Sequence, residues 1–129
     1  MDDPRPILLL LYLVAGHALV DFALQSEAMA LGKCPHAQHP AARAVPWYYW
    51  LAAHALLHGT AVGLVCQWMG LTPAGTLALA LAETLAHALI DLGKCRGWYG
   101  IHRDQALHLL CKLLWWCLAL GAFPSSGGL

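Results

Sequence analysis

Four apolar runs, separated by prolines, glycines and charged residues, dominate this chain of 129 residues. They extend over residues 6–24, 46–69, 73–92 and 104–123. A hydrocarbon core needs about 20 consecutive, mostly apolar residues for each helix that crosses it. With 60% hydrophobic and 11% charged residues, the chain is also far more apolar than an average soluble domain. The runs predict an all-α polytopic membrane protein, a single domain over residues 1–129 built as a four-helix transmembrane bundle.

Prolines and glycines mark the expected ends of these helices. A proline fits the first helical turn, where the backbone donor it lacks is not needed, and three runs begin with Pro6, Pro46 and Pro73. Glycine is typical just beyond the last turn, and we expect helices to stop at Gly32, Gly70 and Gly93.

The basic residues are concentrated in two of the three connecting loops. The positive-inside rule places such loops on the cytoplasmic side, which predicts that both termini lie outside. The net charge is zero, so nothing indicates a nucleic-acid partner. Cys34 and Cys95 fall on the reducing side in this orientation, and we therefore expect no disulfide. The basic residues concerned are Lys33, Arg43, Lys94, Arg96 and Arg103.

A histidine and an aspartate recur with the same spacing in two of the runs. His17-Ala-Leu-Val-Asp21 in the first matches His87-Ala-Leu-Ile-Asp91 in the third. Each is followed by Leu-Gly-Lys-Cys, at residues 31–34 and 92–95. The repetition predicts a duplicated helical hairpin whose two copies run the same way through the membrane.

Every run carries a polar pair four residues apart, which lies on one helix face. Such residues normally face the interior of a membrane bundle and have a partner there. Imidazoles and carboxylates together are the ligands of zinc, iron or manganese. We therefore predict a site for one or two divalent ions, most simply zinc, among His17, Asp21, His54, His58, His87, Asp91 and His108.

Two further carboxylates are candidate catalytic residues. Glu83 is one turn from His87, and Asp104 is one turn from His108. Either could bridge two ions or take a proton from a metal-bound water. The alternative for Glu83 is an ion pair with Lys112, one turn beyond His108.

Basic residues around the predicted cytoplasmic mouth would suit a phosphate or another anionic head group. The alternative is that these charges only set the topology and contact anionic lipid. Gln25 could orient a metal ligand by a hydrogen bond. The candidate substrate-binding residues are Gln25, Lys33, Lys94, Arg96 and Arg103.

Five spaced motifs resemble those of a bacterial and phage family of small membrane proteins catalogued as domain of unknown function 3307. They are His17-x-x-x-Asp21-Phe22-x-x-Gln25, Met29-Ala30-x-x-Lys33, His54-x-x-x-His58, His87-x-x-Ile90-Asp91-x-x-Lys94 and Asp104-Gln105-x-x-His108-Leu109. The resemblance implies a compact protein of the bacterial inner membrane and brings no known reaction. A looser similarity to membrane-bound metal-dependent hydrolases favours hydrolysis slightly.

These observations favour a membrane-embedded metal-dependent hydrolase whose phosphate-bearing or lipid-linked substrate comes from the cytoplasmic leaflet. Three alternatives use the same polar residues: a transporter for metal ions or protons, a haem-binding electron-transfer subunit, and a structural membrane protein. The apolar outer halves of the helices argue against a transport path. Gly59 and Gly63 also form a small-x-x-x-small pattern that could allow a homodimer.

Overall fold

The computed structural model describes residues 3–38, 40 and 44–121. Within these ranges the chain is helical and contains no strand. The first long helix changes from α-helical to π-helical turns before it ends at Leu24. The elements are α1 (Arg5–Ala18), the π-helix η1 (Leu19–Leu24), α2 (Glu27–Gly32), α4 (Trp47–Trp68), α5 (Pro73–Cys95) and α6 (Ile101–Leu120).

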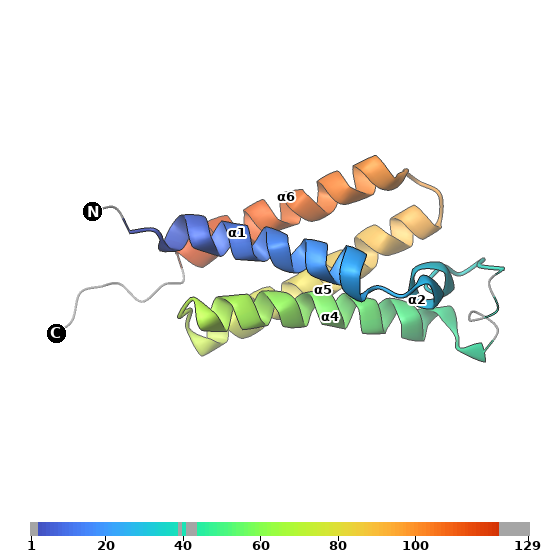
Figure 1. Cartoon of the computed structure of the whole chain (residues 1–129), viewed down its shortest axis with the longest axis horizontal. Helices are drawn as coiled ribbons and strands as arrows, with labels where there is room; N and C mark the ends of the chain where they lie inside the picture. The colour runs from blue at the N-terminus through green and yellow to red at the C-terminus, as the bar shows by residue number, and fades with distance from the viewer. Residues whose placement is uncertain (1–2, 39, 41–43, 122–129) are drawn as a thin grey trace.

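The four long helices run alternately up and down (Figure 1). Helix α1 packs on α4 and α6, and α5 packs on the same two helices, so the bundle is a ring of four. Helices α1 and α5 run in the same direction, as the sequence repeat predicts. The short helix α2 and the α5–α6 loop lie at the end opposite the N-terminus (Figure 1).

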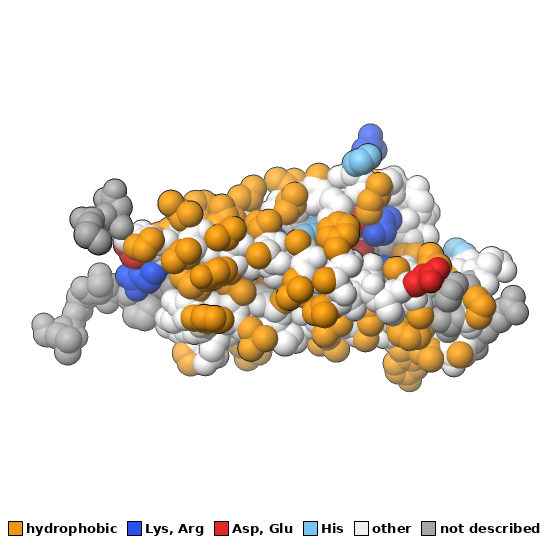
Figure 2. Space-filling view, in the orientation of Figure 1, with side chains coloured by type: hydrophobic (Ala, Val, Ile, Leu, Met, Phe, Trp, Pro, Cys, Tyr) orange, Lys and Arg blue, Asp and Glu red, His pale blue; other side chains and the backbone are white. Residues whose placement is uncertain are grey.

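Three helical segments are long and apolar enough to cross a membrane, at residues 5–24, 47–68 and 73–95. Helix α6 is of similar length but carries Arg103, Asp104 and Lys112, and it does not meet the same criterion. Hydrophobic side chains cover the middle of the molecule, and charged side chains gather toward its ends (Figure 2). The membrane character predicted from the sequence is thus supported for three of the four runs.

An apolar core fills the half of the bundle that lies toward the N-terminus. Leu9 and Leu13 of α1 meet Val62 and Cys66 of α4 there. Trp115 and Ala119 bring α6 into the same cluster, and Leu79 adds α5. The buried polar residues lie in the other half, so the bundle is divided into an apolar and a polar part along its length.

The helix ends follow the expected local chemistry with one exception. Gly70 follows α4 with a φ of 82°, a conformation that suits glycine after a helix. Gly93 does not end α5, because it is buried inside the helix, where a Cβ would come within 2.5 Å of the Tyr99 hydroxyl oxygen. The helix continues to Cys95, and Gly97, with a φ of 74°, reverses the chain instead.

Helices α4 and α5 form the closest helix pair because Gly59 removes a side chain between them. A Cβ at Gly59 would lie 2.0 Å from Oγ1 of Thr84 and 2.6 Å from the carbonyl oxygen of Ala80. A Cβ at Gly63 would lie 3.3 Å from Cβ of Ala80. The small-residue pattern therefore serves packing within the chain, and the homodimer considered from the sequence stays a prediction.

The segment after the first long helix differs from the sequence-based prediction. Ser26 caps α2 by accepting a hydrogen bond from the backbone N–H of Met29, and this helix was not predicted. It brings Cys34 to Cys95, and the two form a disulfide, so the expectation of no disulfide is wrong. The prediction rested on the compartment alone and ignored that the two Leu-Gly-Lys-Cys segments meet. The predicted end of the last run, at Phe123, and Arg43 lie outside the described residues.

Candidate metal centre

The polar half of the bundle holds five imidazoles and three carboxylates in the space between the four long helices. Asp21 is 9% exposed, and the other seven side chains are 3% exposed or less. Helix i,i+4 spacing turns both polar residues of each helix inward, as the sequence predicts. The structure brings together all seven predicted metal ligands, His17, Asp21, His54, His58, His87, Asp91 and His108, with the predicted catalytic residue Asp104.

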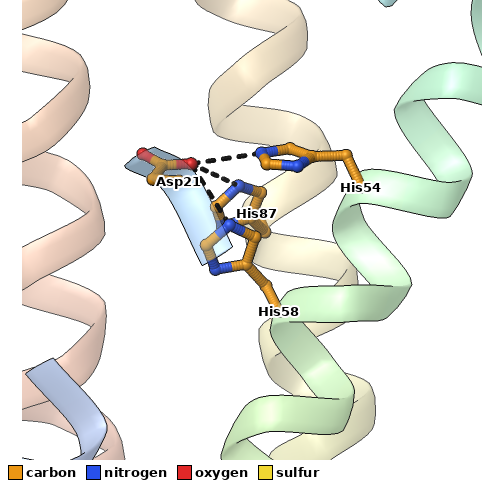
Figure 3. A group of neighbouring side chains, drawn as sticks. All are labelled: Asp21, His54, His58 and His87. Atoms are coloured by element: carbon orange, nitrogen blue, oxygen red, sulfur yellow. Dashed lines mark hydrogen bonds and ion pairs between the residues drawn. The ribbon is translucent and has the colours of Figure 1, made fainter. Parts of the chain in front are cut away.

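Asp21 forms one group with three histidines (Figure 3). Asp21 lies on η1, and the histidines lie on α4 and α5. Its Oδ1 lies 3.1 Å from Nε2 of His54, 3.2 Å from Nε2 of His58 and 4.0 Å from Nε2 of His87. One ligand atom from each of these four residues lies within 4.8 Å of all the others. Three imidazoles and one carboxylate converging on a point match a tetrahedral zinc ligand set. The π-helical turn at Asp21 is a feature that often marks functional sites.

A second group of three residues lies beside the first, where α5 and α6 approach. His108 Nε2 lies 3.7 Å from Oδ1 of Asp91 and 3.6 Å from Oδ1 of Asp104. Oδ2 of Asp91 turns the other way and lies 3.7 Å from Nε2 of His87, a member of the first group. Asp91 therefore stands between the two groups and could bridge two ions.

The imidazole rings lie close to one another. The ring centroids of His58 and His87 are 3.5 Å apart, and those of His87 and His108 are 4.0 Å apart. His17 joins His87 and His108 in a third group of ligand atoms within 4.8 Å of one another. Imidazolium rings at such separations would repel each other, so this packing suits neutral imidazoles that can act as metal ligands.

Several buried polar atoms of the cluster have no hydrogen-bond partner among the described residues. Buried polar groups are almost always hydrogen-bonded, because leaving one unpaired costs about 1–3 kcal/mol. A concentration of unpaired imidazole nitrogens in one place therefore points to a ligand. The atoms are Nδ1 of His17, His58 and His108, Nε2 of His87 and His108, and Oδ1 of Asp104.

Two lysines approach the second group from the end that holds α2. Lys33, 2% exposed, forms a hydrogen-bonded ion pair with Oδ2 of Asp91. Burial lowers the pKa of the Lys33 ammonium below its ordinary value, and the Asp91 carboxylate opposes that shift. Lys94 donates to Oδ2 of Asp104 at 2.9 Å. Of the predicted substrate-binding residues, these two basic side chains reach the cluster.

The other two predicted basic residues lie apart from the cluster. Arg96 is exposed, and its guanidinium lies 5.7 Å from the centre of the Trp98 ring. Arg103 is exposed on the first turn of α6. Both remain at the same end of the molecule as the cluster, but their side chains do not contact it.

Two glutamines contact the ligand side chains. Gln25, predicted from the sequence, places Nε2 3.0 Å from Nε2 of His54. Gln105 was missed, although it donates to Oδ2 of Asp21 at 2.8 Å and places Oε1 3.2 Å from Nε2 of His17. The only available signal was its position next to Asp104 in the fifth motif.

Glu83 lies deeper in the bundle and belongs to none of the ligand groups. Its carboxylate accepts hydrogen bonds from Nζ of Lys112 and from Nε1 of Trp115, both at 2.5 Å. It also lies 3.3 Å from Nδ1 of His87. The ion pair with Lys112 is the alternative that the sequence left open for this residue.

An apolar groove of about 730 Å³ runs between α1 and α4 on the outside of the bundle. Tyr12, Gly16, Ala61 and Val65 line it, and the same four residues border a small pocket that reaches His17, His58 and Lys112. The small pocket has no room for a water molecule, so these side chains separate the groove from the polar cluster.

No curated protein and no solved structure matches the chain. A family model does match, and it covers residues 8–125, which include every residue of the polar cluster. The chain therefore belongs to the family described as protein of unknown function (DUF3307).

Proposed function

We propose that this protein is a membrane-embedded metal-dependent hydrolase that acts on a phosphate-bearing, lipid-linked substrate. The observation that carries the proposal is the convergence of Asp21, His54, His58 and His87, four buried or nearly buried side chains with ligand atoms within 4.8 Å of one another. Buried histidines and acids are costly at membrane depth unless they have a partner. A divalent cation is the partner that this donor set fits best.

The two ligand groups suit two ions of unequal coordination. The group around Asp21 supplies four ligands, which is a closed zinc site. Asp91, Asp104 and His108 supply three ligands, which leaves a position for water or substrate. An ion with an open position lowers the pKa of a bound water and so supplies hydroxide near neutral pH. Zinc is the first candidate, and iron or manganese would also accept these ligands.

The lysines beside the second group are placed to hold an anion. Lys33 and Lys94 neutralise Asp91 and Asp104 in the metal-free protein. A cation bound by those carboxylates would release one or both ammonium groups to pair with a phosphate. Asp104 has one free oxygen, Oδ1, and would act as a ligand or accept a proton from the attacking water.

The membrane placement follows from the same division of the bundle. Helix α6 buries Asp104 and Lys112 against its neighbours, and we propose that it crosses the membrane with the three more apolar segments. Basic residues lie at the end near the polar cluster, so we place that end at the cytoplasmic leaflet of the cytoplasmic membrane. The groove between α1 and α4 would then hold the hydrocarbon part of a lipid substrate on the outside of the bundle.

A transport path is less consistent with the packing. The half of the bundle toward the termini is closed by the apolar core around Leu13, Val62 and Trp115. Among the described residues, no buried charged or histidine side chain lies beyond Glu83 and Lys112 that could bind an ion on its way from the cluster to the other end.

The first test is the metal content of the detergent-purified protein, measured by mass spectrometry as ions per chain. We expect close to two ions in the wild type and a large loss in His54→Ala/His58→Ala. The matched control is His36→Ala/His102→Ala, which removes two exposed imidazoles and should leave the content unchanged. Folded wild-type protein that takes up no added zinc, iron or manganese would refute the proposal.

The reaction is tested separately with the metal-loaded protein in lipid nanodiscs. We expect release of phosphate or of a phosphorylated head group from at least one class of anionic lipid, and loss of this release in Asp91→Asn. Metal-loaded protein that leaves every phosphoester lipid intact would exclude phosphoester hydrolysis while leaving the metal site standing.

A further inference from the structure

Glu83 lies deeper in the bundle than the polar cluster, and its carboxylate contacts the Nδ1 side of the His87 imidazole. It lies one helical turn before His87 on α5 and is 1% exposed. Its Oε1 lies 3.3 Å from Nδ1 of His87 and accepts from Nζ of Lys112, and its Oε2 accepts from Nε1 of Trp115. Both oxygens are thus engaged by neighbours on α5 and α6.

This contact determines which nitrogen of His87 faces the cluster. A carboxylate only accepts, so the hydrogen bond requires the proton of a neutral His87 to be on Nδ1. Nε2 is then unprotonated, and it is one of the buried nitrogens without a hydrogen-bond partner. It lies 4.0 Å from Oδ1 of Asp21 and 3.7 Å from Oδ2 of Asp91, between the two ligand groups. The lone pair of His87 is therefore presented where an ion would be held.

The other four imidazoles of the cluster have no carboxylate within hydrogen-bond distance of Nδ1 among the described residues. Nδ1 of His17, of His58 and of His108 has no hydrogen-bond partner among the described residues. Nδ1 of His54 lies 3.3 Å from Nε2 of Gln25, an amide and not a carboxylate. His87 also belongs to two of the three ligand groups, so its orientation affects both.

We propose that Glu83 is a positioning residue that holds His87 as the Nδ1–H tautomer and so offers Nε2 to the metal, while Lys112 and Trp115 fix the Glu83 carboxylate. This inference rests on the proposed metal centre and assigns Glu83 a role different from the catalytic base or bridge expected from the sequence. A carboxylate behind a ligand histidine fixes the ring orientation, and its loss typically weakens metal binding by about 10- to 100-fold.

The test compares the wild type with Glu83→Gln/Lys112→Met, which removes both charges of the pair so that no buried ion is left alone. Nitrogen NMR of the metal-free protein with labelled histidines reports the tautomer of His87, and competition with a chelator reports zinc affinity. We expect His87 to carry its proton on Nδ1 in the wild type and to lose that preference in the variant. Zinc affinity should fall about 10- to 100-fold at unchanged stoichiometry.

Leu79→Ala is the control for a purely structural effect, because Leu79 is a buried residue one turn before Glu83 on α5. It should lower thermal stability without changing the tautomer or the zinc affinity. A wild-type His87 with its proton on Nε2, or a double variant that binds zinc as tightly as the wild type, would overturn the inference and leave the proposed function intact. A wild type that binds no added zinc, iron or manganese would instead overturn the proposed function.

Discussion

Lys33 and Asp91 form a buried ion pair although 58 positions separate them in the chain. The lysine follows α2, and the aspartate lies near the end of α5, so this pair ties the short helix to the bundle. Both side chains are at most 2% exposed. The Lys33 ammonium lies where a metal ion bound to the Asp91 carboxylate would lie. The two cations should therefore compete for this carboxylate.

Replacing Lys33 by methionine should lower the stability of the metal-free protein and increase the stabilisation that zinc provides. Removing one partner of a buried ion pair leaves the other charge alone and costs about 3–5 kcal/mol, so the melting temperature of the metal-free variant should fall. Bound zinc would replace the lost positive charge, and the increase in melting temperature on adding zinc should exceed that of the wild type. Thermal unfolding in detergent measures both. Arg103→Met, at an exposed residue, is the control. If zinc raised the melting temperatures of Lys33→Met and Arg103→Met by the same amount, Lys33 and the metal would not share a site.

Asp104→Asn should remove one ion and spare the other. Asp104 contributes to the three-residue group with Asp91 and His108 but not to the group around Asp21. An amide also binds divalent cations more weakly than a carboxylate. Native mass spectrometry should therefore find close to one zinc ion per chain in the variant and two in the wild type. Complete loss of zinc would mean that the two groups act as a single site.

Gly59→Ala should destabilise the bundle without changing the residues of the proposed metal centre. The added methyl group would overlap Thr84 and the backbone of Ala80, and overpacking of this kind typically costs about 1–3 kcal/mol. Gly16→Ala is the matched control on another apolar helix, since its Cβ would meet Ala61 at an ordinary 3.8 Å. We expect a lower melting temperature for the first variant only. A changed oligomeric state at unchanged stability would instead place Gly59 between two chains.

The Cys34–Cys95 disulfide provides a test of the orientation in the membrane. In the proposed orientation this end lies in the cytoplasm, where disulfides are usually transient. Because the structure bonds Cys34 to Cys95, we expect a redox-dependent disulfide that is opened in growing cells and closed on mild oxidation. Alkylation of intact cells before lysis, followed by gel electrophoresis beside Cys34→Ser, measures the bonded fraction. A bond already complete in the cells would place this end on the oxidising side and reverse the proposed orientation.

The long helices and the grouping of the candidate ligand residues could be predicted because their signals are local. Apolar length, Pro73 and Gly70 define helix ends within a few residues, and i,i+4 spacing turns both members of a pair such as His54 and His58 to one face. The same rule explains why Asp104 meets the cluster.

The partners of the buried polar side chains could not be predicted, because they depend on contacts between segments that are distant in the sequence. Spacing alone treats Glu83 like Asp91, yet Glu83 meets Lys112 and Trp115 whereas Asp91 meets Lys33. Gln105 carries no distinctive spacing, and its role appears only when α6 lies beside η1. Residues on one helix face therefore share a direction, and the neighbouring helices decide what each one does.

The bond between Cys34 and Cys95 closes a covalent ring that contains all of α4 and α5. A single backbone cut anywhere between these two cysteines opens the ring but leaves one covalent molecule. The two pieces of such a nicked protein would separate on a denaturing gel only after reduction. The helices that supply His54, His58, His87 and His108 would thus stay attached to the segment that supplies Asp21 after proteolysis of the α2–α4 connection, for as long as the disulfide persists.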